Sequence, residues 1–371
     1  MIPFHKTYIT GNEKNLIDRV ISSGSLSGNG EFTGKCHTFF QTEFGFKKVL
    51  LTNSCTDALE MCALLLDIKQ GDEIILPSYT FVSTANAFFN YGAVPVFIDS
   101  EENNPNIDAD KIEAKITAKT KAIVVMHYAG YACEMNKIKS IAQKHNLKII
   151  EDAALGLGSK YHNEWLGGIG DLAAFSFHQT KNITCGEGGL LVINNPEYFE
   201  KAEIIWEKGT NRSAFLRGES DKYEWVSKGS SFLTSEIHAA FLFAQLEFYN
   251  EIQTKRASLW NKYRTELKNN SFFTIPEESS GKTINGSIFY LILKNEGLVD
   301  AFIQFMKENG VAVTKHYRCL HDSIFYKNHF SSENLINCQK IARQLVRLPL
   351  FTDLTNDEQN KIIELTKKFF N

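Results

Sequence analysis

The sequence lacks the features that mark membrane, secreted and nucleic-acid-binding proteins. No apolar run approaches the about 18 residues needed to cross a bilayer, and the opening MIPFHKTYIT lacks the basic and apolar regions of a signal peptide. The 371 residues carry a net charge of only −3, which argues against a general binder of nucleic acids or anionic membranes. We therefore expect a soluble, cytoplasmic protein with no nucleic-acid or membrane partner.

Cysteine is present but shows no paired arrangement. The seven cysteines are odd in number, scattered and never spaced as C-x-x-C: Cys36, Cys55, Cys62, Cys133, Cys185, Cys319 and Cys338. We interpret them as reduced, buried thiols. His316, Cys319 and His321 lie close together in the sequence, but their spacing matches no usual metal site. We therefore expect no bound metal.

Between about residues 49 and 194, short apolar runs alternate with helical patterns. The runs are KVLLT, DEIILP, VPVFID, KAIVVMHY, KIIEDAA, LAAFSFH and GLLVIN. They are nearly continuous in hydrophobic residues, as expected of strands covered on both faces. The helices expected between them are Thr56–Leu66, Val82–Tyr91, Asp108–Ile116 and Met135–His145. This rhythm predicts an α/β fold with a mostly parallel seven-stranded sheet, which binds ligands at the carboxyl ends of its strands.

The pattern changes after residue 232. Apolar residues then recur at three- and four-residue steps, which predicts one long helix or two joined helices: Ile237, Ala240, Phe241, Ala244 and Leu246. The remainder mixes strands and helices. We therefore expect a large domain over residues 1–246 and a smaller C-terminal α+β domain over residues 247–371.

Two stretches are candidates for binding a phosphate. SGNGEFTGKC resembles a Walker loop, but Asn29 breaks the glycine spacing and Cys36 stands where Ser or Thr would bind magnesium. We exclude nucleoside triphosphate binding there. In LLTNSCTDAL a helix begins at small polar residues after a strand, and its free N–H groups with the hydroxyls of Ser54 and Thr56 suit a phosphate. Helix capping alone is the alternative.

Three single residues could serve an aromatic aldehyde cofactor. Asp152 ends a buried strand, where a carboxylate needs a cation such as a protonated pyridine nitrogen, unless it has a capping or structural role. Lys181 follows the next strand in an apolar setting, where desolvation lowers the pKa of its amine so that it can condense with an aldehyde. An exposed loop lysine is the alternative. Phe81 could stack on a ring or pack in the core.

These signals are weak singly and strong together. A phosphate-binding helix start, a stacking ring, a carboxylate and a reactive lysine are what pyridoxal 5′-phosphate requires. The CGEGG stretch after Lys181 adds turns with little side-chain bulk, which we interpret as room for a flat cofactor near the backbone. The sequence therefore predicts a pyridoxal phosphate site.

The chain resembles the nucleotide-sugar aminotransferases of the DegT/StrS family, which have the type I fold of pyridoxal phosphate-dependent transferases. The resemblance covers almost the whole length and is carried by LLTNSCTDALEM, GDEIILPSYTFVSTANA, HYAGYACEM, EDAALG, FSFHQTKN, GEGG, EKGTNRSAFLRGESDKYEW and RLPLF. It is most similar to the subgroup that forms dTDP-4-amino-4,6-dideoxygalactose from dTDP-4-keto-6-deoxyglucose and L-glutamate. Such enzymes supply lipopolysaccharide, O-antigen or enterobacterial common antigen.

The resemblance implies roles for the cofactor-binding residues. Lys181 would hold the cofactor covalently and act in catalysis, Asp152 would pair with the pyridine nitrogen, and Phe81 would stack on the ring. The phosphate and its surroundings would be held by Cys55 (through its backbone), Thr56 and Ser176. The family also implies a homodimer with each active site at the interface.

Two departures from the family concern this site. Leu155 stands where many members have a glutamine that reaches the ring oxygen of the cofactor. GSSFLTSE lacks the asparagine that many members donate across the dimer to the phosphate, so Ser230 or Ser231 would substitute.

The substrate residues also follow from the resemblance. Lys208, Arg212 and Arg217 would bind the diphosphate of the sugar nucleotide, a solvated basic loop being the alternative. His316 in KHYRCLH would face the substrate, and His178 would either contact it or pack. The carrier nucleotide, C3 or C4 amination and the C4 epimer stay open. Related sugar dehydratases have histidine in place of the lysine, and Lys181 argues against them and against a regulatory pyridoxal phosphate-binding protein.

Overall fold

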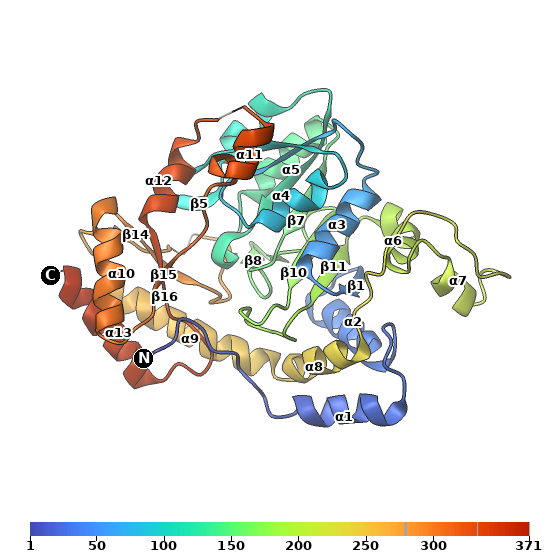
Figure 1. Ribbon diagram of the computed structural model, residues 1–371, viewed down its shortest axis with the longest axis horizontal. Helices are drawn as coiled ribbons and strands as arrows, with labels where there is room; N and C mark the ends of the chain where they lie inside the picture. The colour runs from blue at the N-terminus through green and yellow to red at the C-terminus, as the bar shows by residue number, and fades with distance from the viewer. Residues whose placement is uncertain (278–279, 332, 371) are drawn as a thin grey trace.

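The computed structural model describes residues 1–277, 280–331 and 333–370 and contains a central seven-stranded sheet (Figure 1). Its strand order is β1-β11-β10-β7-β6-β2-β3. The strands are β1 (Lys48–Thr52), β2 (Glu73–Pro77), β3 (Val94–Ile98), β6 (Thr120–Met126), β7 (Lys148–Asp152), β10 (Leu172–Ser176) and β11 (Gly189–Ile193). Only β11 runs antiparallel to its neighbours in this sheet, so the predicted mostly parallel sheet is confirmed, and each predicted run supplies one strand.

Helices cover both faces of this sheet, because successive strand residues point to opposite sides. Leu50 packs in one apolar cluster and Leu51 in another. The first face carries α3 (Cys55–Leu65), α4 (Val82–Phe89) and α6 (Phe199–Trp206). The opposite face carries α1 (Glu13–Ser23), α2 (Glu31–Phe44), α5 (Met135–Lys144) and α8 (Glu236–Glu247). The two-sided burial explains the unbroken apolar runs.

Some of the expected helices differ from the observed ones. The helix predicted over Asp108–Ile116 is wrong: this stretch forms two short 3₁₀ turns, Ala109–Lys111 and Glu113–Lys115. Only Ala109 and Ile112 are buried there, so the stretch has no continuous apolar stripe to hold a helix against the sheet. The segment after residue 232 forms the two joined helices, α8 and α9 (Tyr249–Leu267). Neither α1 nor α2 was anticipated.

A second, antiparallel sheet lies beside the first and has the order β12-β14-β16-β15. Its strands are β12 (Phe273–Thr274), β14 (Phe289–Leu293), β15 (Thr314–Lys315) and β16 (Leu345–Leu348), and the helices of this region are α10 (Val299–Glu308), α11 (Ile324–His329), α12 (Ile336–Gln344) and α13 (Asn356–Phe370). The N-terminal segment joins this part of the chain, since Ile2 pairs with Val311. Within the described ranges, no helix combines the length and apolarity needed to cross a membrane.

The stretch SGNGEFTGKC, which resembles a Walker loop, forms the start of α2. The Glu236 carboxylate, from the first residue of α8, accepts hydrogen bonds from the backbone N–H of Gly30 at 3.0 Å, Phe32 at 2.6 Å and Thr33 at 3.0 Å. A Cβ on Gly30 would lie 2.8 Å from Cδ of Glu236, and one on Gly28 would lie 2.1 Å from the carbonyl oxygen of Thr234. These glycines therefore allow close approach of α8, whose carboxylate satisfies the unpaired N–H groups at the start of α2.

Replacing this carboxylate tests its contribution to stability. We expect Glu236→Gln to lower the free energy of unfolding by about 1–3 kcal/mol, because an amide brings an NH₂ group against buried N–H donors. Urea unfolding followed by circular dichroism measures the change. Glu251→Gln, at an exposed position of α9, is the control and should stay within about 0.5 kcal/mol of the native protein. Equal unfolding midpoints for the two variants would contradict the assignment.

Candidate active site

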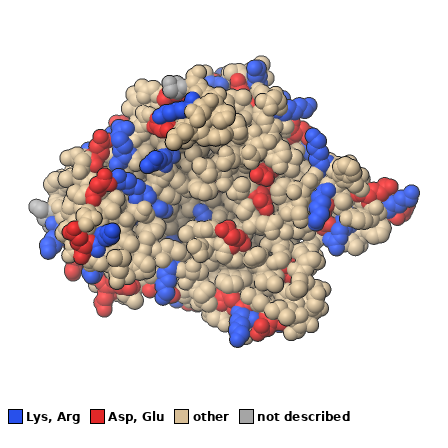
Figure 2. Space-filling model, viewed as in Figure 1, with Lys and Arg blue, Asp and Glu red and all other residues tan. Residues whose placement is uncertain are grey.

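Four loops that carry sequence-predicted residues meet at one edge of the large sheet. They follow the carboxyl ends of β1, β2, β7 and β10 and bring Ser54, Phe81, Asp152 and Lys181 together. These residues line a cavity of about 560 Å³, here called the large-sheet cavity. A second cavity of about 560 Å³, the intersheet cavity, extends from Lys181 to residues of the small sheet. Figure 2 shows a hollow at the centre of this face, with basic atoms on its floor.

The phosphate end of the large-sheet cavity is formed where α3 and α4 begin. Ser54 accepts a hydrogen bond at its Oγ from the N–H of Asp57 at 3.0 Å, and the hydroxyls of Thr56 and Ser83 are 2.7 Å apart. This second bond joins the starts of the two helices, whose first N–H groups attract an anion. Ser54 thus caps α3, the alternative considered from the sequence, and it also lines the cavity, so its role toward a phosphate stays a prediction.

The glycines after Lys181 have a different role from the one expected. A Cβ on Gly189 would lie 2.3 Å from the carbonyl carbon of Ser54, so this glycine lets β11 pass directly beneath the start of α3. Gly186 has a φ of +86°, which requires glycine for the turn itself. Only Gly188 lines the large-sheet cavity. Packing of the loop therefore accounts for two of these glycines.

Two adjacent carboxylates at the end of β7 have opposite environments. Glu151 points away from the cavity, where His127 Nε2 lies at 2.9 Å and three backbone N–H groups bind it at 2.7–2.8 Å. Burial alone would raise the pKa of Glu151, but these bonds lower it. Asp152 lines the cavity and accepts bonds from the Thr84 hydroxyl at 2.6 Å and the Ala154 N–H at 3.1 Å. It has no ion-pair partner among the described residues, and burial raises its pKa.

Lys181 and Phe81 complete the large-sheet cavity. Burial lowers the pKa of the Lys181 amine, which favours the neutral, nucleophilic form. Phe81 precedes α4 and is 55% exposed, which is unusual for a phenylalanine beside a buried sheet edge. Its ring is tilted by 41° to that of Tyr317, with the ring centres 6.2 Å apart, and its exposed face offers a surface on which a flat ring can stack.

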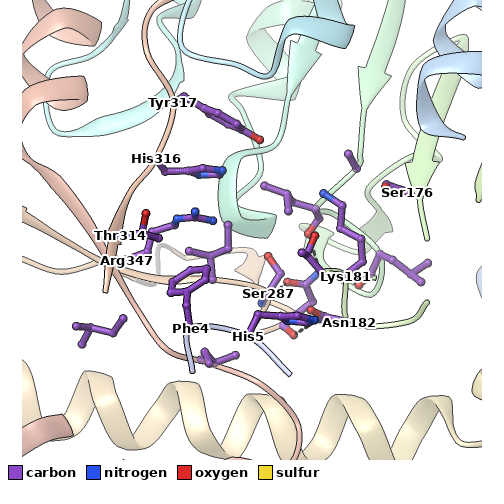
Figure 3. A pocket seen from close by; sticks show the side chains of 18 of the residues that line it. Phe4, His5, Ser176, Lys181, Asn182, Ser287, Thr314, His316, Tyr317 and Arg347 are labelled. Carbon is purple, nitrogen blue, oxygen red and sulfur yellow. Dashed lines mark hydrogen bonds between the residues drawn. The ribbon is translucent and has the colours of Figure 1, made fainter. Parts of the chain in front are cut away.

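The intersheet cavity places Arg347 opposite Lys181 (Figure 3). Arg347 comes from β16, and burial lowers the pKa of its guanidinium. Its Nε is buried and has no hydrogen-bond partner in the described part of the chain. The guanidinium carbon lies 4.6 Å from the centre of the Phe4 ring, so the N-terminal segment forms part of the wall. Sequence reasoning missed Arg347 and Phe4, because both reach the cavity only through the tertiary fold.

His316 lies between the two cavities and lines both. Its Nδ1 is 2.8 Å from the Tyr128 hydroxyl, and its ring stacks on that of Tyr317 at 3.6 Å. Burial, with the nearby charges of Arg347 and Lys181, lowers the pKa of His316 to about 2. The imidazole is therefore neutral and polar.

Several sequence-predicted residues lie elsewhere in the protomer. Residues 207–231, here called the tongue, project from the body at the right of Figure 1 and carry Lys208, Arg212, Arg217 and Ser231. None of these four lines the two cavities. Arg212 pairs with Glu207 at 3.3 Å, and Arg217 with Glu203 and Glu219 at 2.9 and 2.8 Å.

The remaining predicted residues reach the site. Ser176 and Leu155 line both cavities, while Cys55, Thr56 and His178 line the large-sheet cavity. His178 lies at the rim, with its Nδ1 2.8 Å from the Thr180 hydroxyl and its Nε2 3.6 Å from Glu187. The side chain of Leu155 offers no hydrogen bond to a ring oxygen.

The chemistry of the large-sheet cavity fits pyridoxal phosphate. The helix starts suit its phosphate, the uncovered face of Phe81 suits its ring, and the unpaired, buried Asp152 suits a protonated ring nitrogen. Lys181, with its lowered pKa, suits the aldehyde. Each group that the cofactor needs is therefore present in one cavity.

The buried amine should reduce the stability of the cofactor-free protein. The pKa of Lys181 is lowered on folding, so the unfolded chain binds more protons between that value and about 10.4, and stability rises with pH over this window. We expect Lys181→Met to raise the melting temperature of cofactor-free protein near pH 7.5, and the gain to shrink toward pH 10. Lys307→Met, at an exposed position, is the control. A Lys181→Met variant that melts below the native protein would disprove this account.

Comparisons with known proteins agree with this chemistry. Residues 7–367 match the model of the DegT/DnrJ/EryC1/StrS aminotransferase family. The chain is 32% identical over 347 residues to the uncharacterized protein MJ1066 of Methanocaldococcus jannaschii, an alignment that covers 91% of this chain and 90% of the relative.

Solved structures share the fold over its full length. Helicobacter pylori PseC, an aminotransferase involved in the biosynthesis of pseudoaminic acid, superposes with a TM-score of 0.91 at 26% identity, covering 100% of this chain and 99% of that one. The pyridoxal phosphate form of the putative sugar aminotransferase Spr1654 from Streptococcus pneumoniae gives a TM-score of 0.92 at 25% identity, covering all of both chains. The chain thus belongs to the DegT/DnrJ/EryC1/StrS family and is a pyridoxal phosphate-dependent sugar aminotransferase.

Proposed function

We propose that the protein transfers an amino group from L-glutamate to dTDP-4-keto-6-deoxy-D-glucose, forming dTDP-4-amino-4,6-dideoxy-D-galactose and 2-oxoglutarate for cell-surface polysaccharides. The observation that carries the amino transfer is the position of Lys181, which lines both cavities. One cavity fits the cofactor, and the other has the size of a small-molecule site. The identity of the sugar nucleotide rests on the sequence stretches SYTFVSTANAF and EKGTNRSAFLRGESDKYEW.

The residues of the chain divide the work of this reaction. Pyridoxal phosphate, when bound, supplies an aldehyde that accepts an amino group and a ring that accepts electrons. Asp152 would hold a proton on the ring nitrogen through its negative charge, and the Thr84 hydroxyl, which donates to this carboxylate, orients it. With the cofactor bound, Lys181 would carry protons at its Nζ, because its lowered pKa favours the neutral amine that accepts one.

Arg347 is the group that we assign to the carboxylate of the amino donor. A planar guanidinium binds a carboxylate through two parallel hydrogen bonds, and Arg347 is buried with a free Nε. Figure 3 shows it across the cavity from Lys181, so a bound amino acid can span the two. The neutral His316 between them is suited to a sugar hydroxyl or keto oxygen.

The tongue supports a homodimer in which each active site receives residues from both copies. Its exposed apolar side chains are Phe215, Leu216, Tyr223, Trp225 and Val226, with Trp225 82% exposed. Apolar groups gathered on a projecting segment favour burial against another chain. We assign the basic residues Lys208, Arg212 and Arg217 to the diphosphate of the substrate bound in the partner, where Ser231 would also reach the cofactor phosphate.

Product analysis tests the reaction. We expect protein incubated with pyridoxal phosphate, L-glutamate and dTDP-4-keto-6-deoxyglucose to yield a sugar whose C4 amine is axial in the NMR spectrum. An equatorial amine would assign the gluco epimer instead. Formation of no amino sugar would contradict the proposed substrate and direct the search to 3-keto sugars or other carriers. Lys181→Ala should form no product while retaining the fold. Unchanged function of Lys181→Ala in cells would favour a regulatory protein.

Steady-state kinetics test the assignment of Arg347. We expect Arg347→Met to raise the KM for L-glutamate about 10–100-fold, because a charged hydrogen bond contributes about 1.5–3 kcal/mol. The KM for the sugar nucleotide should change much less. Arg343→Met is the control, because Arg343 is exposed and pairs with Glu296 outside the cavity. Equal effects on both substrates would remove Arg347 from the donor site.

A further inference from the structure

A cluster of metal-binding side chains lies next to the active site but takes no part in it. Cys319, His321 and Cys338 are all buried, and their ligand atoms lie within 4.8 Å of one another. Cys319 and His321 follow the cavity residue Tyr317 in the chain, whereas Cys338 comes from α12. The sequence spacing gave no sign of this site, because Cys338 reaches it only through the fold.

The imidazole of His321 is arranged like that of a metal ligand. Its Nδ1 lies 2.6 Å from the hydroxyl of Ser78, while its Nε2 is buried and has no hydrogen-bond partner in the described ranges. A metal-binding histidine uses one ring nitrogen for the metal and donates the other N–H to a second residue. A buried nitrogen without a partner costs about 1–3 kcal/mol, and a bound ion would remove that cost.

The carboxylate of Asp322 lies beside the imidazole but outside the group of three mutually close ligand atoms. Oδ2 of Asp322 lies 3.6 Å from Nε2 of His321, and its side chain is 40% exposed. Gln339 donates to this oxygen at 3.0 Å, and Lys327 lies 3.2 Å from the other carboxylate oxygen. Hydrogen bonds of this kind orient carboxylates that bind metals.

The ligand set selects the ion. Two thiolates, an imidazole and a carboxylate suit tetrahedral zinc, with bonds of about 2.0–2.3 Å. Such bonds place neighbouring ligand atoms about 3.3–3.8 Å apart, so the three buried ligand atoms need to approach one another by no more than about 1–1.5 Å. Asp322 must in addition turn its carboxylate toward the two sulfurs. We propose that Cys319, His321, Cys338 and Asp322 bind a structural zinc ion.

Zinc binding here exchanges the ion for protons. In the metal-free protein the Cys338 thiol donates to the carbonyl of Leu335 at 3.3 Å. Zinc forms bonds to both sulfurs, and the two thiol protons leave to solvent, with no change of oxidation state. The ion ties the segment that carries His316 and Tyr317 to α12, and through Ser78 it reaches the end of β2.

Metal analysis of the untagged, full-length holoenzyme tests the proposal. Protein kept reduced, incubated with zinc chloride and desalted should contain about one zinc per chain by mass spectrometry of the metal. Cys338→Ser should lose at least about nine-tenths of it, because the remaining groups no longer complete the site. Cys36→Ala, which removes a buried cysteine outside the cluster, should retain the native content.

A second variant keeps the test decisive if Cys338→Ser does not fold. Asp322→Asn changes a half-exposed residue, and we expect it to weaken zinc binding at least about tenfold in competition with a chromophoric chelator. Zinc should also raise the melting temperature of metal-depleted native protein. Native protein without zinc and with both thiols free would overturn the proposal. So would an intact mass lighter by two hydrogens, which would assign a disulfide between Cys319 and Cys338.

Discussion

The active site depends on one carboxylate that the fold buries without an ion-pair partner in the described part of the chain. Asp152 ends β7 inside the large-sheet cavity, where Thr84 and the backbone orient it but no cation of the described chain pairs with it. Its neighbour Glu151, at the same strand end, has a full set of hydrogen bonds, from His127 and from three backbone N–H groups. The partner that we propose for Asp152 is the protonated pyridine nitrogen of the cofactor.

The small sheet supplies what the large sheet cannot. The large-sheet cavity offers one strand edge and two helix starts that fit the cofactor, and the small sheet lines the cavity beside it. Arg347 on β16 and His316 after β15 face Lys181 across the intersheet cavity. Burial lowers the pKa of both groups, but the guanidinium starts so much higher that it keeps its positive charge, whereas the imidazole is neutral. The cavity thus presents one cationic and one neutral polar group to its ligand.

Most of the large sheet could be predicted from the sequence, because each strand is a local apolar run covered on both faces. The same strand pattern marked the candidate site: Asp152 ends β7, and Ser54, Phe81 and Lys181 lie in the loops after β1, β2 and β10, so the fold brings them to one cavity. The helices α1 and α2 escaped prediction, since α2 begins at glycines that become intelligible only when Glu236 is placed beside them. The stretch Asp108–Ile116 has helical spacing but too few buried residues to form a helix.

Residues that reach the site through distant packing could not be predicted. Arg347, Phe4 and Cys338 lie far along the chain from the groups that they approach, and no local pattern marks them. The basic residues of the tongue are the opposite case, because their sequence pattern suggested a binding role but they lie away from the cavities. Arg212 and Arg217 have the chemistry of phosphate ligands, but within one protomer they pair with acidic neighbours away from the cavities. A residue type therefore predicts a binding function only when the fold also places that residue beside the site of the ligand.

The link between Glu236 and α2 also constrains how the chain acquires its structure during synthesis. During synthesis, the N–H groups at the start of α2 have no carboxylate to bind until Glu236 is made, 203–206 residues further along the chain. A ribosome adding about 5–20 residues per second needs about 10–40 s to make that stretch. Over this interval the nascent chain holds a helix whose start is solvated and whose apolar face has no α8 to cover it. Helices α1 and α2 therefore gain the helix that they pack against only late in synthesis, although they are made first.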